Sequence, residues 1–384
     1  MTASDARWMR RALRLAARGA ERTSPNPMVG AAIVADDRSV GDGYHKEVGG
    51  PHAEVWALKA AGEAARGATL YVTLEPCSHH GRTPPCADAI IHAGLRRVVA
   101  AVLDPNPTVN GKGVQILRDA GIEVEVGLLE AEARALNAAY FKHTISGLPL
   151  VSLKAAMSLD GKIATRAGES RWITGERARK LAHRLRAEHD AVMVGVRTVL
   201  GDNPRLTVRS VRGRNPLRVV VDSAARTPSV SALLSADECP PIIAVTQQAP
   251  QERVEALQRA GAEVWVLPDE PPPPTPSARP STPLGIDAER GRVDLVALMR
   301  RLGEREVQSV LIEGGGILAS AALAAGLVDR VYFLIAPLII GGAEAPTAVG
   351  GEGVARLADA WRVGNMKVQR IGEDVLITGD IVRG

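Results

Sequence analysis

The chain has 384 residues, of which 46% are hydrophobic and 23% charged, the balance of a globular protein long enough for two domains. Its formal charge is only +4 and arginine is spread along the chain, which favours small anionic ligands over a nucleic-acid groove. Three cysteines, no signal-peptide pattern and no apolar run of eighteen residues lead us to expect a reduced, cytoplasmic protein without a membrane span.

The first part of the chain alternates between helical and extended patterns. Apolar spacing predicts a helix over 5–19, followed by strands at 28–34 and 39–45 that the turn "ADDR" joins. The predicted elements that follow are a helix at 52–62, a strand at 68–74, a helix at 86–94, a strand at 96–104, a helix at 113–121, a strand at 122–128 and one closing helix at 130–143. A hairpin followed by this alternation indicates a three-layer α/β domain.

A second domain begins with the strand pattern in "SGLPLVSLKAAMS", so we divide the chain into domains 1–146 and 147–384. Its further strand candidates lie at 190–195, 217–222, 241–246, 262–267, 309–315 and 330–337, with a closing antiparallel pair at 365–372 and 374–382. The tract 269–283, "DEPPPPTPSARPSTP", cannot pack as helix or strand and is expected to form an exposed loop insertion.

A first motif joins "PHAE" to a later pair of cysteines. His52 and Glu54 open a predicted helix, Cys77 follows the next strand in "EPC", and Cys86 opens the helix after that. H-x-E followed by P-C-x-x-C is the signature of zinc deaminases, although eight residues separate the cysteines here. Taken alone, His52 and Glu54 would be an exposed histidine and a solvated carboxylate.

The residue types suit a catalytic zinc, which has three protein ligands and leaves its fourth position to water. Glu54 would then move the proton of that water without binding the metal. A structural zinc is the alternative and would need a fourth protein ligand, which His79 or His80 could supply. Cys239 lies in the other domain and is expected to take no part.

A second motif, "SVLIEGGGILASAAL", places a glycine run between a strand and a helix. Backbone N–H groups at such a helix start can bind phosphate, although a tight turn is the simpler interpretation. The run does not match G-x-G-x-x-G and comes late in the domain, so an ordinary dinucleotide-binding fold is not expected.

Several stretches resemble one known family. "TSPNPMVGAAIV", "GYHKEVGGPHAE", "TLYVTLEPCSHHGRTPPCADAII" and "AVLDPNPTVNGKGVQIL" resemble the deaminase domain of the bifunctional riboflavin-biosynthesis deaminase/reductases, and "VSLKAAMSLDGKIAT", "LRAEHDAVMVGVRTVLGDNPRLTVR" and "LIEGGG" resemble their reductase domain. The resemblance implies an α/β protein in which a cytidine-deaminase-like three-layer domain precedes a dihydrofolate-reductase-like domain.

For the first domain, the resemblance implies one Zn²⁺ on His52, Cys77 and Cys86, with Glu54 as the catalytic proton shuttle. It further implies six residues that bind the pyrimidine and its ribose phosphate: Asn26, His45, His79, Arg82, Asp104 and Asn106. Each of the six has an alternative as a turn or surface residue, because asparagine beside proline is common in turns.

For the second domain, the resemblance implies NADPH as the cofactor. The residues implied to contact NADPH are Ala156, Trp172, Thr198, Asp202, Ser223, Gly315, Gly316, Ile317, Leu318, Ala319, Ser320 and Ala321. Those implied to contact the substrate are Ser170, Arg186, Leu206, Arg209 and Glu313. Lys154 and Asp202 are candidates for assisting hydride transfer. Alternatively, Trp172 belongs to the core, Arg186 is a charge on a helix face and Asp202 is a turn residue.

These expectations amount to two consecutive reactions of riboflavin biosynthesis. The first is hydrolytic deamination of 2,5-diamino-6-(5-phosphoribosylamino)pyrimidin-4-one, and the second is reduction of the ribosyl group of 5-amino-6-(5-phosphoribosylamino)uracil to ribityl. The partners would be small phosphorylated pyrimidines, without nucleic acid or membrane, and the chain would form a dimer or tetramer. The alternatives are a nucleoside or RNA deaminase with an unrelated second domain, and a binding module with a closed zinc site.

Overall fold

A computed structural model describes residues 2–78, 85–235, 239–270 and 291–382. The chain divides into two compact units, Met1–Gly147 and Leu148–Gly384. The second domain was predicted to start at Gly147, which is instead the last residue of the first unit. His79, Arg82 and most of the proline-rich tract lie outside the described residues. No helix in the described part of the chain is long and apolar enough to cross a bilayer.

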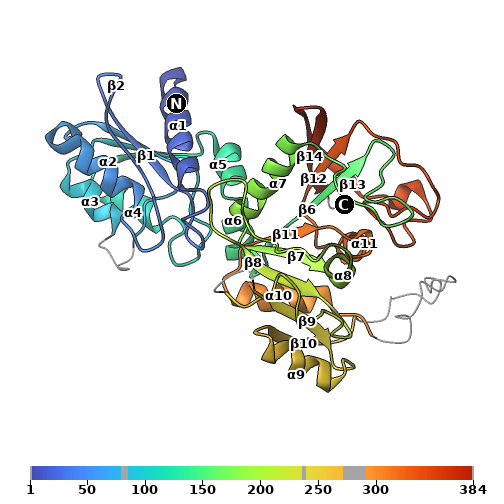
Figure 1. The fold of residues 1–384 in the computed structure, drawn as a ribbon. Helices are drawn as coiled ribbons and strands as arrows, with labels where there is room; N and C mark the ends of the chain where they lie inside the picture. The colour runs from blue at the N-terminus through green and yellow to red at the C-terminus, as the bar shows by residue number, and fades with distance from the viewer. Residues whose placement is uncertain (1, 79–84, 236–238, 271–290, 383–384) are drawn as a thin grey trace. The chain divides into compact units, whose positions relative to one another are not determined.

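The first unit is a five-stranded sheet in the order β2-β1-β3-β4-β5, with helices on both faces (Figure 1). Its strands are β1 Gly30–Ala35, β2 Arg38–Tyr44, β3 Thr69–Val72, β4 Arg97–Ala100 and β5 Glu123–Val126. Its helices are α1 Ala3–Ala16, α2 Ala53–Ala61, α3 Cys86–His92, α4 Lys112–Asp119, α5 Glu130–Leu136 and α6 Ala138–Ser146. One apolar cluster joins α2, α3 and α4 to one face of the sheet, and another joins α1, α5 and α6 to the other face.

The start of α1 shows how sequence and packing combine. Thr2 caps the helix, since its hydroxyl accepts a hydrogen bond from the N–H of Asp5 while the Asp5 carboxylate accepts one from the N–H of Thr2. The same carboxylate accepts hydrogen bonds from the Tyr71 hydroxyl at 2.7 Å and from Arg97 Nη1 at 2.8 Å. Buried Asp5 therefore ties the helix to β3 and β4.

The single closing helix predicted over 130–143 is wrong. The structure has two helices there, α5 and α6, which meet at Asn137. The Asn137 side chain accepts a hydrogen bond from the N–H of Met28 at 2.8 Å and donates one to its carbonyl at 2.9 Å. This tertiary contact ends one helix and starts the next, and helical periodicity cannot reveal it.

The second unit is a nine-stranded sheet in the order β10-β9-β8-β7-β11-β6-β12-β14-β13. Its strands are β6 Leu150–Ser158, β7 Ala191–Gly195, β8 Leu217–Val221, β9 Ile242–Thr246, β10 Glu263–Leu267, β11 Ser309–Glu313, β12 Arg330–Ala336, β13 Arg362–Ile371 and β14 Asp374–Val382. Its helices are α7 Glu176–Glu188, α8 Val196–Asp202, α9 Gln251–Arg259, α10 Leu295–Glu304 and α11 Gly316–Ala324. The first seven strands in the sheet order are parallel, and β14 and β13 are antiparallel.

Apolar runs such as "AVMV" and "IIAVT" form the centre of this sheet because both of its faces are covered. Along β7, Ala191 and Met193 face the cluster with α10 and α11, whereas Val192 and Val194 face the cluster with α9. Because seven strands run parallel, their carboxyl ends lie on the same side of the sheet. Open α/β sheets bind ligands at these carboxyl ends.

Candidate functional sites

Three side chains of types that can bind a metal meet in the first unit. His52 is the N-cap of α2, Cys86 is the first residue of α3, and Cys77 follows β3. Their ligand atoms lie within 4.8 Å of one another. Nδ1 of His52 is 3.2 Å from Sγ of Cys86 and 3.5 Å from Sγ of Cys77. The sulfur of Cys77 also accepts a hydrogen bond from the backbone N–H of Cys86. The structure thus brings together the residues that the first motif singled out.

The surroundings of these groups favour their reactive forms. Hydrogen bonds from Cys86 and His52 hold the pKa of the Cys77 thiol well below its usual range, despite opposing burial. Glu54, in the first turn of α2, is 3% exposed, and this burial raises its pKa to about 7. A carboxyl group with that pKa can accept and release a proton at neutral pH. Because His79 and His80 lie outside the described residues, a fourth protein ligand from that loop stays untested.

His45 lies beside the metal-binding group. Its ring meets the His52 ring edge-on, with centroids 5.6 Å apart. Nε2 of His45 is 3.1 Å from the amide nitrogen of Asn26, and Nδ1 is 3.2 Å from the carbonyl of Pro51. Burial lowers the pKa of His45, which favours its neutral form. Two of the expected pocket residues, Asn26 and His45, are therefore joined next to the cluster.

Asp104 and Asn106 form the turn after β4. Asp104 Oδ1 accepts hydrogen bonds from the N–H of Asn106 at 2.9 Å and from the Tyr140 hydroxyl at 2.8 Å. Asn106 Oδ1 accepts from both the N–H and the hydroxyl of Thr108. This is the turn arrangement expected as the alternative for these residues, and the Asn106 side-chain amide nitrogen forms no hydrogen bond with the residues that the structure describes.

The second unit holds a buried charge cluster beside the end of β11. Glu313 accepts two hydrogen bonds from Arg186 of α7, from Nε at 2.7 Å and from Nη2 at 2.8 Å. Lys154, its register partner on β6, places Nζ 3.7 Å from the same carboxylate. Burial opposes ionisation of Glu313, but the charges of Arg186 and Lys154 outweigh it and lower the pKa to about 2. Burial lowers the pKa of Lys154.

The segment before α7 is tied to the end of α8. The Ser170 hydroxyl donates to Asp202 Oδ1 at 3.1 Å, and Arg171 donates to the Asp202 carbonyl at 2.5 Å. Trp172 is 69% exposed, with the guanidinium of Arg179 4.6 Å from its ring centroid. The alternative that Trp172 belongs to the core is therefore wrong, and an exposed aromatic face is left for a ligand.

The glycine run turns tightly from β11 into α11. Gly314 and Gly315 have positive φ angles of 73° and 87°, which glycine adopts without strain. A Cβ on Gly314 would lie 3.3 Å from the Thr198 hydroxyl. Thr198 and the glycine turn are thus neighbours, as a shared ligand would require.

The run 315–321 divides between surface and core. Leu318 and Ala319 are 6% and 2% exposed and pack in the apolar cluster, whereas Ile317 is 37% exposed. Gly315 and Gly316 can offer only backbone groups, so Ile317 and the half-buried Ser320 and Ala321 remain the candidates for side-chain contact with a ligand.

Four other expected residues differ in their surroundings. The Leu206 side chain is 2% exposed within the apolar cluster, so only its backbone can meet a ligand. Arg209 is exposed and donates to the Thr207 hydroxyl at 3.3 Å. Ser223 follows β8, where its hydroxyl accepts a hydrogen bond from Val293. Ala156 is half-buried on β6.

Comparisons with known proteins match both units. A family model described as the cytidine and deoxycytidylate deaminase zinc-binding region matches residues 2–102, and the RibD C-terminal domain matches 149–377. The riboflavin biosynthesis proteins RibD of Aquifex aeolicus and Escherichia coli are each 42% identical over 374 residues, which is 97% of this chain and 97% and 98% of theirs.

Solved structures agree over the whole length. RibD of Acinetobacter baumannii is 38% identical, with 99% of both chains covered and a TM-score of 0.83. The diaminohydroxyphosphoribosylaminopyrimidine deaminase/5-amino-6-(5-phosphoribosylamino)uracil reductase of Thermotoga maritima is 34% identical, with the same coverage and a TM-score of 0.81. The chain belongs to the RibD family. It is a bifunctional deaminase/reductase of riboflavin biosynthesis, with a zinc-binding deaminase domain followed by a reductase domain.

In the deaminase domain, the role of Glu75 was not predicted from the sequence. This buried carboxylate accepts hydrogen bonds from the N–H groups of Asp104 at 3.2 Å, Gly111 at 2.9 Å and Val114 at 3.2 Å. It thereby holds the loop before α4 against the loop that carries Cys77. Its place directly before Pro76–Cys77 was the only signal in the sequence.

In the reductase domain, the loop over residues 337–351, which we call the β12 loop, was not predicted to take part. Asp160 accepts hydrogen bonds from the N–H groups of Ile340 at 3.0 Å and Gly341 at 2.7 Å. Further along, the N–H of Gly350 donates to the carbonyl of Gly316 at 2.9 Å. A Cβ on Gly316 would collide with the Thr347 carbonyl. The β12 loop therefore packs against the glycine turn, and the glycine pairs "GG" at 341–342 and 350–351 were its signal in the sequence.

Proposed function

We propose that the deaminase domain hydrolyses the 2-amino group of 2,5-diamino-6-(5-phosphoribosylamino)pyrimidin-4-one, and that the reductase domain uses NADPH to reduce the ribosyl group of the product to ribityl. The observation that carries the proposal is the convergence of His52, Cys77 and Cys86 beside buried Glu54, within a full-length RibD chain. The name of the Thermotoga maritima relative supports both substrates.

The donor set fits zinc. One imidazole and two thiols are ligand types that zinc prefers, and three protein ligands leave a position for water or substrate. When bound, zinc supplies a Lewis acid that makes water nucleophilic at neutral pH. His52, Cys77 and Cys86 would hold it, and the lowered pKa of Cys77 keeps that thiol ready for binding.

Glu54 is proposed to move the proton. Its buried carboxylate would accept a proton from the attacking water and donate it to the departing amine, so that ammonia leaves. His45, held neutral by burial and joined to Asn26, would contribute hydrogen bonds to the pyrimidine. We assign His79 and Arg82 to the same pocket on the family resemblance alone.

The reductase domain fits NADPH at the glycine turn. Gly314, Gly315 and Gly316 present backbone without side chains at the start of α11, where N–H groups favour phosphate. When bound, NADPH supplies the hydride that reduces C1′ of the ribosyl group. Thr198, beside the turn, and the exposed ring of Trp172 are the proposed side-chain contacts.

The charge cluster is proposed to orient the sugar. Because two nitrogens of the Arg186 guanidinium are already bound to Glu313, Arg209 is the better candidate for the substrate phosphate. Lys154 is buried with a lowered pKa and is our candidate for donating a proton to the sugar oxygen. We also propose that the chain self-associates into a dimer or tetramer, which light scattering would measure.

Metal analysis and an ammonia assay test the deaminase assignment. Cys77→Ser and Cys86→Ser should lose both bound zinc and ammonia release, whereas Cys239→Ser, an exposed cysteine of the other unit, should lose neither. Glu54→Gln should keep zinc and lose at least about a hundredfold in rate, the usual size of a general acid–base contribution. Full activity of Glu54→Gln would exclude the proposed mechanism.

A further inference from the structure

A pocket of about 560 Å³ lies over the open edge of the deaminase sheet, within the usual size range of small-molecule sites. β2 forms this edge, since among the described strands it pairs only with β1. The pocket is lined by α1, β2 and α2, and we call it the α1–β2–α2 pocket. It contains neither the zinc ligands nor Glu54.

The charged residues of the pocket are strongly unbalanced. Five cations line it, namely Arg11 and Arg14 of α1, Arg18 of the 3-10 turn that follows α1, Lys46, and Lys59 of α2, against the single carboxylate of Asp42. Arg11 is neutralised, because its Nε donates to Asp42 Oδ1 at 2.8 Å. The other four form no salt bridge with any carboxylate of the described residues. Four like charges around one pocket repel one another unless an anion joins them.

An aromatic ring orders two of these cations. Nζ of Lys46 is 3.7 Å from the centroid of the Trp56 ring, and Nζ of Lys59 is 5.7 Å from the same centroid. Cation–π contacts of this kind restrict lysine side chains that would otherwise sample many rotamers. The two ammonium groups are therefore partly ordered before a ligand arrives, which lowers the entropic cost of binding.

We infer that the α1–β2–α2 pocket binds a small ligand that carries at least two phosphate groups. A phosphate monoester has a charge of about −1.5 to −2 at neutral pH, so two of them match four unpaired cations. Arginine and lysine together suit such a ligand, since arginine binds oxyanions with its fork and lysine as a point charge. This site goes beyond the proposed function, which assigns no ligand there.

An acidic peptide added along β2 is the competing occupant, and the strand geometry disfavours it. The β1–β2 ladder shifts register between Ile33 and Val34, which leaves Val40 as an extra residue in β2. A bulge of this kind twists an edge strand and interrupts the row of groups that a further strand would need.

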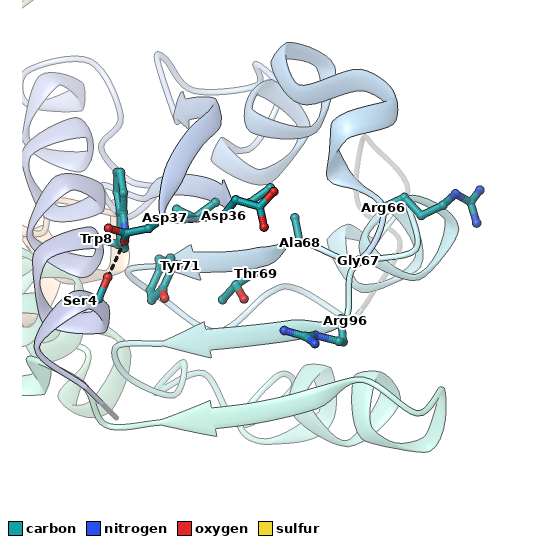
Figure 2. Close-up of a pocket in the computed structure, with 12 residues that line it drawn as sticks. Ser4, Trp8, Asp36, Asp37, Arg66, Gly67, Ala68, Thr69, Tyr71 and Arg96 are labelled. Atoms are coloured by element: carbon teal, nitrogen blue, oxygen red, sulfur yellow. Dashed lines mark hydrogen bonds between the residues drawn. The ribbon is translucent and has the colours of Figure 1, made fainter.

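A second pocket of the same domain shows that excess charge is not general (Figure 2). It has a volume of about 410 Å³, and Asp36 and Asp37 offset Arg66 and Arg96 in its lining. Asp37 already accepts hydrogen bonds from Ser4 at 2.6 Å and from the Trp8 ring nitrogen at 2.9 Å. The two acidic and two basic residues of this pocket therefore balance, unlike the five cations and one carboxylate of the α1–β2–α2 pocket.

Calorimetric titration of the full-length protein with inorganic pyrophosphate, without divalent metal, tests the inference. Lys46→Gln/Lys59→Gln and Arg14→Gln/Arg18→Gln should each weaken binding about a hundredfold, because removing one charge-assisted hydrogen bond weakens binding about tenfold. Arg10→Gln is the matched control, because Arg10 is exposed on α1 and does not line the pocket. Equal affinity in all variants, or no binding to the wild type, would overturn the inference.

A labelling experiment on the wild type needs no variant to fold. Pyrophosphate should slow acetylation of Lys46 and Lys59 by a water-soluble ester, measured by mass spectrometry, and should leave acetylation of exposed Lys180 unchanged. Protection by a hexaglutamate peptide together with no protection by pyrophosphate would contradict a phosphate ligand and favour a peptide.

Discussion

Glu313 neutralises two cations that the fold takes out of water. Arg186 and Lys154 are 14% and 13% exposed in their side chains, and Glu313 is 7% exposed. Removing one member of a buried cluster leaves the others uncompensated, which costs far more than losing a surface pair. The same carboxylate fixes the positions of the two groups proposed to face the sugar.

Glu313→Gln should therefore lower the free energy of unfolding by about 3–5 kcal/mol and abolish the reductase activity. Glu263→Gln is the control, because its pair with Arg305 is 39% and 45% exposed and is worth at most about 1 kcal/mol. Urea unfolding and the two separate activity assays measure both. An equally small effect of the two substitutions would show that Glu313 does not hold the cluster together.

His189 is a buried group whose protonation opposes folding. Nδ1 lies 2.7 Å from the Leu185 carbonyl, to which it can only donate, and Nε2 lies 2.9 Å from the Ser152 hydroxyl, from which the neutral ring accepts a hydrogen bond. Burial lowers its pKa in the folded protein. In the unfolded chain it titrates near the ordinary value of about 6.5.

Below that pH the unfolded state binds a proton that the folded state excludes, so stability falls as the pH falls from about 6.5 towards the lowered pKa. This one proton contributes up to about 1.4 kcal/mol per pH unit. His189→Gln should give a shallower decline between pH 7.5 and 5.5 in urea unfolding. His92→Gln, at an exposed histidine, should keep the wild-type slope, and identical slopes for all three proteins would contradict the assignment.

At the scale of the elements, the residues of the proposed zinc site and of the proposed NADPH site lie at helix starts and in loops. α2 and α3 begin at His52 and Cys86, and α11 begins at Gly316. The β12 loop then fixes the glycine turn from outside, through Asp160 at one end and Gly350 at the other. A hydrogen bond from the Ser158 hydroxyl and two from loop N–H groups lower the pKa of Asp160 to about 2.

Asp160→Ala should free the N–H groups of Ile340 and Gly341 and loosen the β12 loop. We expect faster hydrogen exchange at 340–350 and an NADPH dissociation constant raised about tenfold, which corresponds to the loss of one or two charged hydrogen bonds. The control is Asp359→Ala, which removes an exposed carboxylate that, among the described residues, binds only nearby Arg356. Faster hydrogen exchange with an unchanged NADPH dissociation constant would show that the β12 loop does not contribute to NADPH binding.

The sequence predicted these elements unevenly. Strands of the second sheet could be located because burial on both faces makes them continuous apolar runs, and His52, Glu54, Cys77 and Cys86 because zinc chemistry restricts their types. The break at Asn137 could not be found, since its cause is a contact with Met28 that lies far away in the sequence. Asp160 was hidden for the same reason.

On the scale of the whole molecule, the two activities belong to units with separate cores. The proposed zinc ligands lie in Met1–Gly147, and the charge cluster and glycine turn lie in Leu148–Gly384. Separate cores allow one unit to be perturbed without the other.

Removal of zinc by a chelator should abolish ammonia release and leave reduction of 5-amino-6-(5-phosphoribosylamino)uracil unchanged. Added zinc should restore the first activity, because the protein ligands remain in place. The two rates are followed by ammonia detection and by NADPH absorbance. A parallel loss of both would show that the units depend on each other.

The most direct test of the whole account is incubation of the enzyme with 2,5-diamino-6-(5-phosphoribosylamino)pyrimidin-4-one, with and without NADPH, followed by mass spectrometry. Without NADPH, the product should have the mass expected when one amino group is replaced by a hydroxyl group or its keto tautomer. With NADPH, it should gain two further hydrogens. An unchanged substrate, or a gain of two hydrogens without prior deamination, would contradict the two-step function.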